Sequence, residues 1–304
     1  AILAQAVAAA HGLQRSAAHQ RWCVAAMRSS RGAFAALTAL GLTCGQSPGC
    51  LVTKCGSHLP QCIADSACRQ ILGCMAQCGT SNMTCQYLCQ TETLSPVYND
   101  LTACMMRNNC IGPHIDHDTP DNFCSRLDSL PTVSYTMEAI MSKWWVNYGL
   151  NIALDCVPCQ YFSFVPDPLD SSKVTVEQGF RSFKNRIWNL INMTARPSAD
   201  DLQRGVLPNN YTQAGFSAID SWYILGVQGD EMLAVYCQPF PWQTHGVFLM
   251  SRAPGRCMQH TDHWRSVLER SGIHWKNVCR ADVVSDDCTR SIQSASPEAV
   301  AIHV

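Results

Sequence analysis

The stretch that decides the fold lies between residues 222 and 251 and reads WYILGV (222–227), MLAVYC (232–237) and GVFLMS (246–251). Each segment is rich in β-branched and aromatic residues, and turn-forming residues separate the segments. Short strands that recur about every 8–12 residues between turns are typical of all-β sandwiches and barrels. Together with VTV (174–176), these segments predict an antiparallel meander that closes into a barrel around an apolar ligand cavity.

An amphipathic helix is expected after the strands. Residues 260–278 contain the run HWRSVLERSG (263–272), which fits such a helix, and Gly272 ends it as a glycine at a helix C-terminus commonly does. The sequence therefore predicts a mainly β domain over residues 138–285 and a polar tail over residues 286–304.

Upstream of this domain the chain is dominated by cysteine. The chain contains 19 cysteines. A reducing cytosol would leave them without cross-links, so the count indicates an oxidising compartment. Residues 44–112 predict a small disulfide-rich domain, because ten of the cysteines fall there within about sixty residues: Cys50, Cys55, Cys62, Cys68, Cys74, Cys78, Cys85, Cys89, Cys104 and Cys110.

Good helix formers surround these cysteines, so short helices are expected. Cys74 and Cys78, and likewise Cys85 and Cys89, are four residues apart, which places both sulfurs of each pair on one helix face. Two such helices would form a hairpin that is cross-linked twice. Zinc is the alternative, but zinc sites more often show C-x2-C spacing with histidine nearby, and the domain contains only His58.

Composition excludes several classes of function. The 304 residues correspond to about two domains. The net charge of −1 provides no basic surface for nucleic acid, so no nucleic-acid partner is expected. Neither a glycine-rich phosphate loop nor a GxSxG motif occurs, which argues against nucleotide cofactors and serine hydrolysis. No apolar run reaches the roughly 18 residues of a membrane-spanning helix.

The flanking segments have their own compositions. Residues 1–43 predict a targeting segment: residues 1–32 contain no acidic side chain, and an apolar run at 33–42 fits a second translocation signal. An amphipathic N-terminal helix is the alternative. Residues 113–137 predict a linker, and the histidines and aspartates at 114–118 could bind a metal or sense pH, although a solvated connector is favoured.

Several motifs resemble those of one known family. They are KWWVNYGLN (143–151), Asp155, Cys159-Gln160, DSWYIL (220–225) and the CIADSAC core of the cysteine ladder (62–68). The combination resembles the violaxanthin de-epoxidase family over residues 50–280. The resemblance implies a lipocalin-like eight-stranded antiparallel β-barrel with a C-terminal helix, preceded by a small disulfide-rich α-helical domain.

The resemblance also implies a disulfide pattern. The cysteines without a place in it include Cys44, Cys124, Cys156, Cys237, Cys257 and Cys288. Cys156 and Cys159 form a C-x-x-C motif that could be a redox pair, although a structural Cys159 is favoured. The implied pairs are Cys50–Cys68, Cys55–Cys62, Cys74–Cys89, Cys78–Cys85, Cys104–Cys110 and Cys159–Cys279.

The reaction of the family removes the epoxide oxygen from a carotenoid ring, with ascorbate as co-substrate and water as product. An acid must protonate that oxygen, and a carboxylic acid can do so where apolar surroundings raise its pKa. The resemblance assigns this role to Asp220 and a second catalytic role to Tyr236. No metal is expected. The residues expected to contact the substrate are Gln160, Trp145, Trp222, Cys237 and Met250.

The chain also departs from the family pattern. The catalytic tyrosine of the family falls on Cys237, and only the preceding Tyr236 remains. A second cavity tyrosine falls on or next to Met250. The differences around Cys159 argue against an acid-triggered switch, because the family's pH-sensing groups are replaced there by Pro158, Phe162 and Val165.

Three functions therefore stay open. The first is an oxidoreductase that removes the epoxide of violaxanthin or diadinoxanthin with ascorbate. The second is a related isomerase of epoxy-carotenoids with a neoxanthin-type product, and the third is a non-catalytic carotenoid-binding or lumenal structural protein. The resemblance implies a chloroplast thylakoid-lumen location, where the membrane surface or a photosynthetic complex could be a partner.

Overall fold

The structure of the chain is a computed structural model. No helix in its described part is long and apolar enough to cross a membrane. The described residues are 48–78, 83–108, 110, 123–170, 172–213, 216–238, 244–254, 258–281 and 288.

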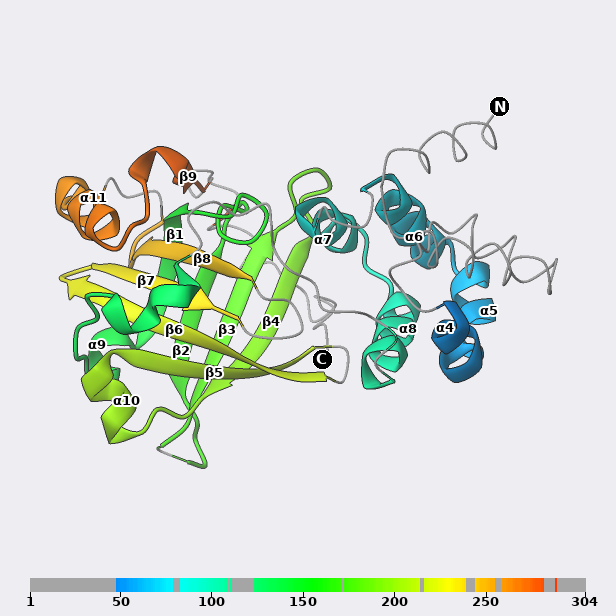
Figure 1. The fold of residues 1–304 in the computed structure, drawn as a ribbon, viewed down its shortest axis with the longest axis horizontal. Coiled ribbons are helices and arrows are strands. Elements are labelled where there is room, and N and C mark those ends of the chain that lie inside the picture. Colours follow the sequence, from blue (N-terminus) through cyan, green and yellow to red (C-terminus); the bar gives the residue numbers. More distant parts are fainter. Residues whose placement is uncertain are drawn as a thin grey trace, which may run out of the picture.

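The first part of the described chain is a module of short helices, at the right of Figure 1. Its small core gathers cysteines with Leu51, Ile71, Tyr98 and Leu101. We call residues 48–110 the helical module. Its helices are α4 (Pro48–Cys55), α5 (His58–Ala64), α6 (Ser66–Cys78), α7 (Met83–Thr91) and α8 (Pro96–Arg107).

The second part is an antiparallel barrel, as the sequence predicts. Strand β1 pairs with β8 on one side and with β2 on the other, so strands β1 to β8 form a closed ring, and β9 adds to β1. The strands are β1 (Ser142–Gly149), β2 (Tyr161–Pro166), β3 (Val174–Arg181), β4 (Trp188–Ala195), β5 (Val206–Gln213), β6 (Phe216–Gln228), β7 (Glu231–Cys237), β8 (His245–Ser251) and β9 (Cys279–Arg280).

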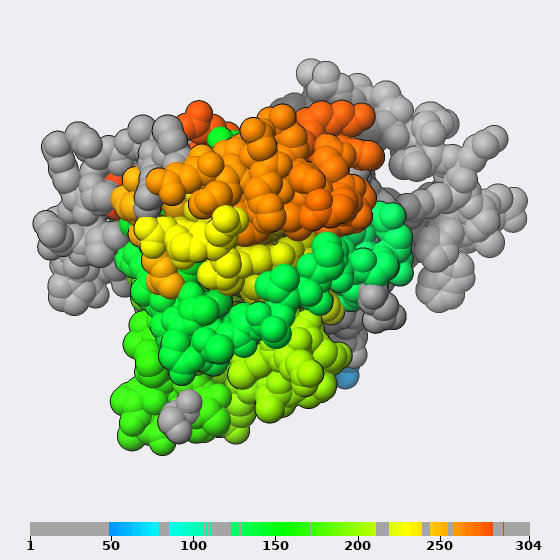
Figure 2. Space-filling model, turned by 90° about the vertical axis from the view of Figure 1, so that its left-hand side faces the viewer, coloured from blue at the N-terminus to red at the C-terminus, as the bar shows by residue number. Residues whose placement is uncertain are grey.

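Two short helices, α9 (Met137–Ile140) and α10 (Ala199–Arg204), lie at the end of the barrel that faces away from the helical module (Figures 1 and 2). Two others, η1 (Cys124–Ser129) and α11 (Thr261–Arg270), pack on the outer face of β6 to β8. A last turn, η2, spans Trp275–Asn277. The predicted C-terminal helix is confirmed as α11, and Gly272 follows it at a φ of 76°.

Alternation along the strands separates two apolar cores. Side chains that point into the barrel, such as Trp144, Phe162 and Trp222, form one core. The outward side chains of β6 to β8, such as Leu233 and Val247, form the second core with α11 and with Phe123. The period of two along each strand therefore decides which residues can meet an interior ligand.

The helical module docks onto the turn between β3 and β4. The carboxylate of Glu92 accepts hydrogen bonds from the backbone N–H groups of Lys184 and Asn185, both at 2.7 Å. The Asn185 side chain donates to the backbone oxygen of Glu92, and helix α8 contacts β6. The module therefore lies beside the end of the barrel at which β6 begins (Figure 1).

The disulfide pattern corrects part of the prediction. The twice cross-linked hairpin of α6 and α7 is present, with Cys74–Cys89 and Cys78–Cys85. The other four predicted pairs, Cys50–Cys68, Cys55–Cys62, Cys104–Cys110 and Cys159–Cys279, are wrong. The observed pairs are Cys50–Cys110, Cys55–Cys104, Cys62–Cys68, Cys124–Cys237, Cys156–Cys279 and Cys159–Cys288.

Helix packing explains the corrected pairs of the module. Helix α4 packs against α8, so Cys50 and Cys55 meet Cys110 and Cys104 rather than nearer cysteines. In the barrel, Cys156 and Cys159 do not bond to each other, so the proposed redox pair is not a disulfide in this structure. Each cysteine instead attaches a segment near the C-terminus to the loop before β2.

The structure bears on the predicted linker and tail but not on the predicted targeting segment. The targeting segment 1–43 lies outside the described residues, as do the histidines and aspartates at 114–118. The second half of the predicted linker belongs to the barrel, because Phe123, Leu130 and Tyr135 are buried against it. In the predicted polar tail, Cys288 is fully buried.

Candidate functional site

Asp220 lies on the inner face of the barrel. It pairs with Asn209 of β5, two positions before the pair of Trp222 with Leu207. Trp222 and Leu207 are both buried in the interior core, and side chains two apart on a strand share a face. The alternation therefore places Asp220 on the inner face, near the end of the barrel beside the helical module.

The Asp220 carboxyl group has one partner and one free oxygen. Trp222 Nε1 donates a hydrogen bond to Oδ2 at 2.9 Å, whereas Oδ1 is buried without a hydrogen-bond partner. Burial raises the pKa of Asp220 from 3.8 to about 7, and the bond from Trp222 opposes this shift. The group can therefore hold a proton near neutral pH and donate it to an oxygen beside Oδ1.

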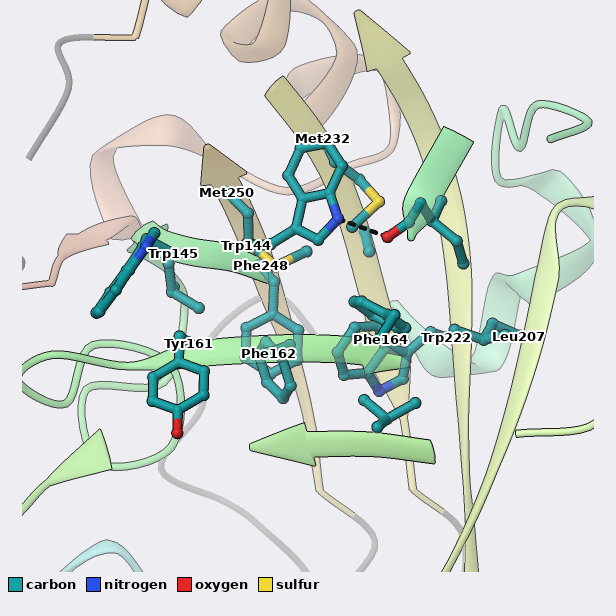
Figure 3. Close-up of a cluster of buried hydrophobic side chains, with 14 of the residues drawn as sticks. Trp144, Trp145, Tyr161, Phe162, Phe164, Leu207, Trp222, Met232, Phe248 and Met250 are labelled. Atoms are coloured by element: carbon teal, nitrogen blue, oxygen red, sulfur yellow. Dashed lines mark hydrogen bonds between the residues drawn. The ribbon is translucent and has the colours of Figure 1, made fainter. Parts of the chain in front are cut away.

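Aromatic side chains form a packed layer around Trp222 in the barrel interior (Figure 3). The rings of Phe162 and Trp222 are 4.6 Å apart between centroids, and Phe248 lies 4.7 Å and 5.0 Å from them. Phe162 comes from β2 and Trp222 from β6, which stand on opposite walls of the barrel. Packed rings therefore fill the predicted apolar cavity at this level of the barrel.

Tyr236 points into the same interior. Its ring stacks on Phe248 with centroids 4.8 Å apart, and its hydroxyl donates to Asp155 Oδ1 at 2.7 Å. Tyr236 pairs with Trp222, so it stands diagonally from Asp220, at roughly 7–8 Å for such neighbours. The predicted catalytic pair is therefore on one face, although Tyr236 is engaged by Asp155.

Asp155 is completely buried and is held by the backbone. Its Oδ2 accepts hydrogen bonds from the N–H groups of Leu150, Asn151 and Val247 at 2.9, 2.8 and 3.1 Å. Burial raises the pKa of Asp155 to about 7, although these hydrogen bonds oppose the shift. Asp155 fixes the orientation of Tyr236, and together they can pass a proton.

Glycine is required beside this pair. A Cβ atom on Gly246 would lie 2.3 Å from Asp155 Oδ2 and 2.5 Å from Tyr236 Cε1. A Cβ atom on Gly149 would lie 2.1 Å from Asp155 Cβ. Any side chain at either position would therefore displace the aspartate.

Gln160, a predicted substrate contact, is fully buried just before β2. Its Nε2 donates to the backbone oxygen of Leu154 at 2.7 Å, and its Oε1 has no hydrogen-bond partner. Gln160 therefore presents one unpaired acceptor.

Two predicted contacts are wrong because of strand alternation. Trp144 pairs with the inward Phe162, whereas Trp145 pairs with Tyr161 on the opposite face, where their ring centroids are 5.4 Å apart. Cys237 also faces outward and is bonded to Cys124. The inward position on β7 belongs to its neighbour Tyr236.

Met250 does point inward, but toward the covered end of the barrel. It pairs with Met232, which pairs with Val227 of β6. Val227 is seven residues from Asp220, or roughly 20 Å along a strand. Figure 3 shows Met250 and Met232 beside Trp144 rather than beside Trp222. Met250 therefore does not share a site with Asp220.

Sequence reasoning missed Asn209 as a site residue. Asn209 is fully buried opposite Asp220, and neither atom of its amide group has a hydrogen-bond partner. The available signal was its place two residues after the apolar Leu207, but strand β5 was not predicted.

Within the described part of the chain, the cluster of side chains that could hold a metal ion lies in the helical module, away from Asp220. The sulfurs of Cys74, Cys78 and Cys89 lie within 4.8 Å of one another. All three are in disulfides, so they offer no thiolate ligand.

Comparison with known proteins gives one family. The family described as the VDE lipocalin domain matches residues 47–283. Violaxanthin de-epoxidase, chloroplastic, from Arabidopsis thaliana is 25% identical over 187 residues, which are 58% of this chain and 38% of that protein. The matched region thus spans well under half of the relative's length.

Solved structures with a similar fold share little sequence with this chain. Lobster apocrustacyanin A1 aligns with a TM-score of 0.41 and 12% identity, over 59% of this chain and 94% of that one. Insecticyanin from the tobacco hornworm Manduca sexta aligns with a TM-score of 0.44 and 13% identity, over 52% and 86%.

Proposed function

Because this chain belongs to the family of the VDE lipocalin domain, we propose that it removes the epoxide of a xanthophyll such as violaxanthin or diadinoxanthin. The ligand is a carotenoid, and ascorbate is the reductant. The observation that carries the proposal is the inward carboxyl group of Asp220, with an unpaired Oδ1 and a pKa of about 7 above an aromatic layer.

The proposed reaction is a two-electron reduction that removes the epoxide oxygen as water. Protonated Asp220 donates its proton to the epoxide oxygen while one C–O bond breaks. Ascorbate supplies two electrons and, in total, two protons; the second C–O bond breaks, the ring gains a carbon–carbon double bond, and the oxygen leaves as water. Ascorbate is oxidised to dehydroascorbate, and Asp220 regains its proton.

Packing limits how the pigment binds. Since Phe162 and Trp222 meet across the barrel, one carotenoid ring enters from the side of Asp220 and stops at the aromatic layer. The apolar polyene then leaves through the end beside the helical module. We further propose a chloroplast location, in the thylakoid lumen, with the membrane surface or a photosynthetic complex as partner.

The test is turnover by the oxidised protein with violaxanthin and ascorbate, followed by chromatography of the pigments. We expect Asp220→Asn to lower the rate by at least about 100-fold. Asp230→Asn, in the exposed turn after β6, is the matched control and should retain the rate. The wild-type rate should fall as pH rises through about 7, because Asp220 then loses its proton.

Two outcomes would replace this function. Loss of epoxide without ascorbate, with an isomer as product, would identify the isomerase. A pigment that binds and is recovered unchanged would identify a carotenoid-binding protein. The aromatic layer favours this second candidate as the alternative, since a packed interior can hold a ring without any chemistry.

A further inference from the structure

Asn209 occupies a position where an unpaired amide is costly. Its side chain is fully buried, and both its Nδ2 donor and its Oδ1 acceptor have no hydrogen-bond partner. Buried polar groups in folded proteins are nearly always paired, so an orphaned amide calls for an explanation. The neighbouring inward residue on β5 is Leu207, which packs in the core as expected.

The unpaired atoms of Asn209 and Asp220 are neighbours. The two residues are direct cross-strand partners, so their Cβ atoms are roughly 5 Å apart on one face. Asp220 Oδ2 is occupied by Trp222 Nε1, whereas Oδ1 is free. One donor and two acceptors without partners thus lie side by side on the inner face of the barrel.

We propose that Asn209 is a ligand-binding residue that recognises the oxygen of a carotenoid ring. Its Nδ2 donates a hydrogen bond to the same ring oxygen that Asp220 faces, and its Oδ1 accepts from a ring hydroxyl. The proposal rests on the carotenoid ligand proposed above and adds the group that selects oxygenated rings. An apolar ring would leave all three atoms unpaired, so the site discriminates against it.

Selective binding tests the proposal without requiring turnover. Quenching of tryptophan fluorescence gives Kd for violaxanthin, whose rings carry oxygen, and for β-carotene, which has the same polyene without oxygen. We expect the wild-type protein to prefer violaxanthin. Asn209→Leu should weaken violaxanthin binding about tenfold, as loss of one such hydrogen bond does, and change β-carotene binding by less than about twofold.

The controls separate binding from folding. Asn210→Leu changes the same residue type on the exposed face of β5 and should leave both Kd values unchanged. Thermal unfolding of Asn209→Leu without pigment should occur at the same or a higher temperature, because two unpaired polar atoms disappear.

Unchanged preference in Asn209→Leu, or equal binding of both pigments by the wild-type protein, would overturn the proposal. A lower unfolding temperature together with unchanged preference would assign Asn209 a structural role instead. A wild-type protein that binds violaxanthin selectively through Asn209 but never reduces it would contradict the de-epoxidase function alone.

Discussion

Among the described residues, five disulfides join parts of the helical module, whereas three attach segments outside the ring of strands to the barrel. The small core of the module combines four buried cysteines with large side chains such as Ile71, Tyr98 and Leu101. The barrel buries Trp144, Phe162, Phe164, Trp222 and Phe248 together. We therefore infer that disulfide bonds contribute most to the stability of the module, while burial of apolar side chains contributes most to that of the barrel.

Chemical reduction of the disulfides should have the largest effect, and it should act on the two regions differently. Loss of one native disulfide from a small domain typically costs about 2–5 kcal/mol, and the module has five. We expect dithiothreitol to abolish the helical far-UV circular dichroism of the module while near-UV tryptophan signals of the barrel persist. Simultaneous loss of both signals would contradict the separation.

Truncation of the aromatic layer should have the next largest effect. Trp222→Ala removes a side chain that is 1% exposed and contacts Phe162 and Phe248, so we expect a loss of about 3–5 kcal/mol. Urea unfolding of the oxidised protein measures it. Ile219→Ala, on the same strand at 49% exposure, should change stability little. Equal effects would show that the layer does not support the barrel.

The ionisation of Asp220 should make the stability of the barrel depend on pH. Its pKa is about 7 in the folded barrel and 3.8 when unfolded, so between these pH values the folded state binds a proton that the unfolded state has lost. Stability from this group is therefore complete below about pH 4 and is lost as pH rises through 7.

Asp220→Asn should remove this dependence. At pH 7.5 we expect the variant to gain about 1–3 kcal/mol, because no charge is buried there. Urea unfolding at pH 4.5 and 7.5 gives the difference between the variant and the wild-type protein. A variant that is less stable at pH 7.5 would mean that the carboxylate has a partner.

The smallest effect concerns the contact between the two regions. Glu92→Ala removes the acceptor for the N–H groups of Lys184 and Asn185, which should cost about 1 kcal/mol. Hydrogen exchange should accelerate at these two amides and leave the interior strands protected. Asp100→Ala, on the exposed side of α8, is the matched control. Unchanged exchange in Glu92→Ala would show that other contacts hold the module in place.

Local patterns in the sequence predicted local structure well. The four-residue spacing of Cys74 with Cys78 and of Cys85 with Cys89 indicated the helix hairpin, and segments rich in β-branched and aromatic residues between turns indicated strands. Long-range pairs could not be inferred in this way. The partners of Cys50 and Cys55 are 60 and 49 residues away and depend on how α4 packs against α8.

The candidate site shows the same limit at finer scale. The resemblance pointed to Asp220, which lies on the inner face. Which residue of an adjacent pair faces inward depends on strand register, and a shift of one residue exchanges the two faces. The sequence alone therefore could not choose Tyr236 over Cys237, or Trp144 over Trp145. Asn209 was missed because the sequence 209–210, Asn-Asn, resembles a turn rather than a strand.

The aromatic layer of Phe162, Trp222 and Phe248 has an evolutionary consequence if the proposed function holds. It separates Met232 and Met250 from Asn209 and Asp220, which we propose to contact a ligand. Met232 and Met250 can drift to other apolar residues of similar volume, because cores tolerate such exchanges. Asn209 and Asp220 would instead be constrained by the chemistry of that ligand. Rates of substitution among descendants of this gene should therefore change abruptly at that layer.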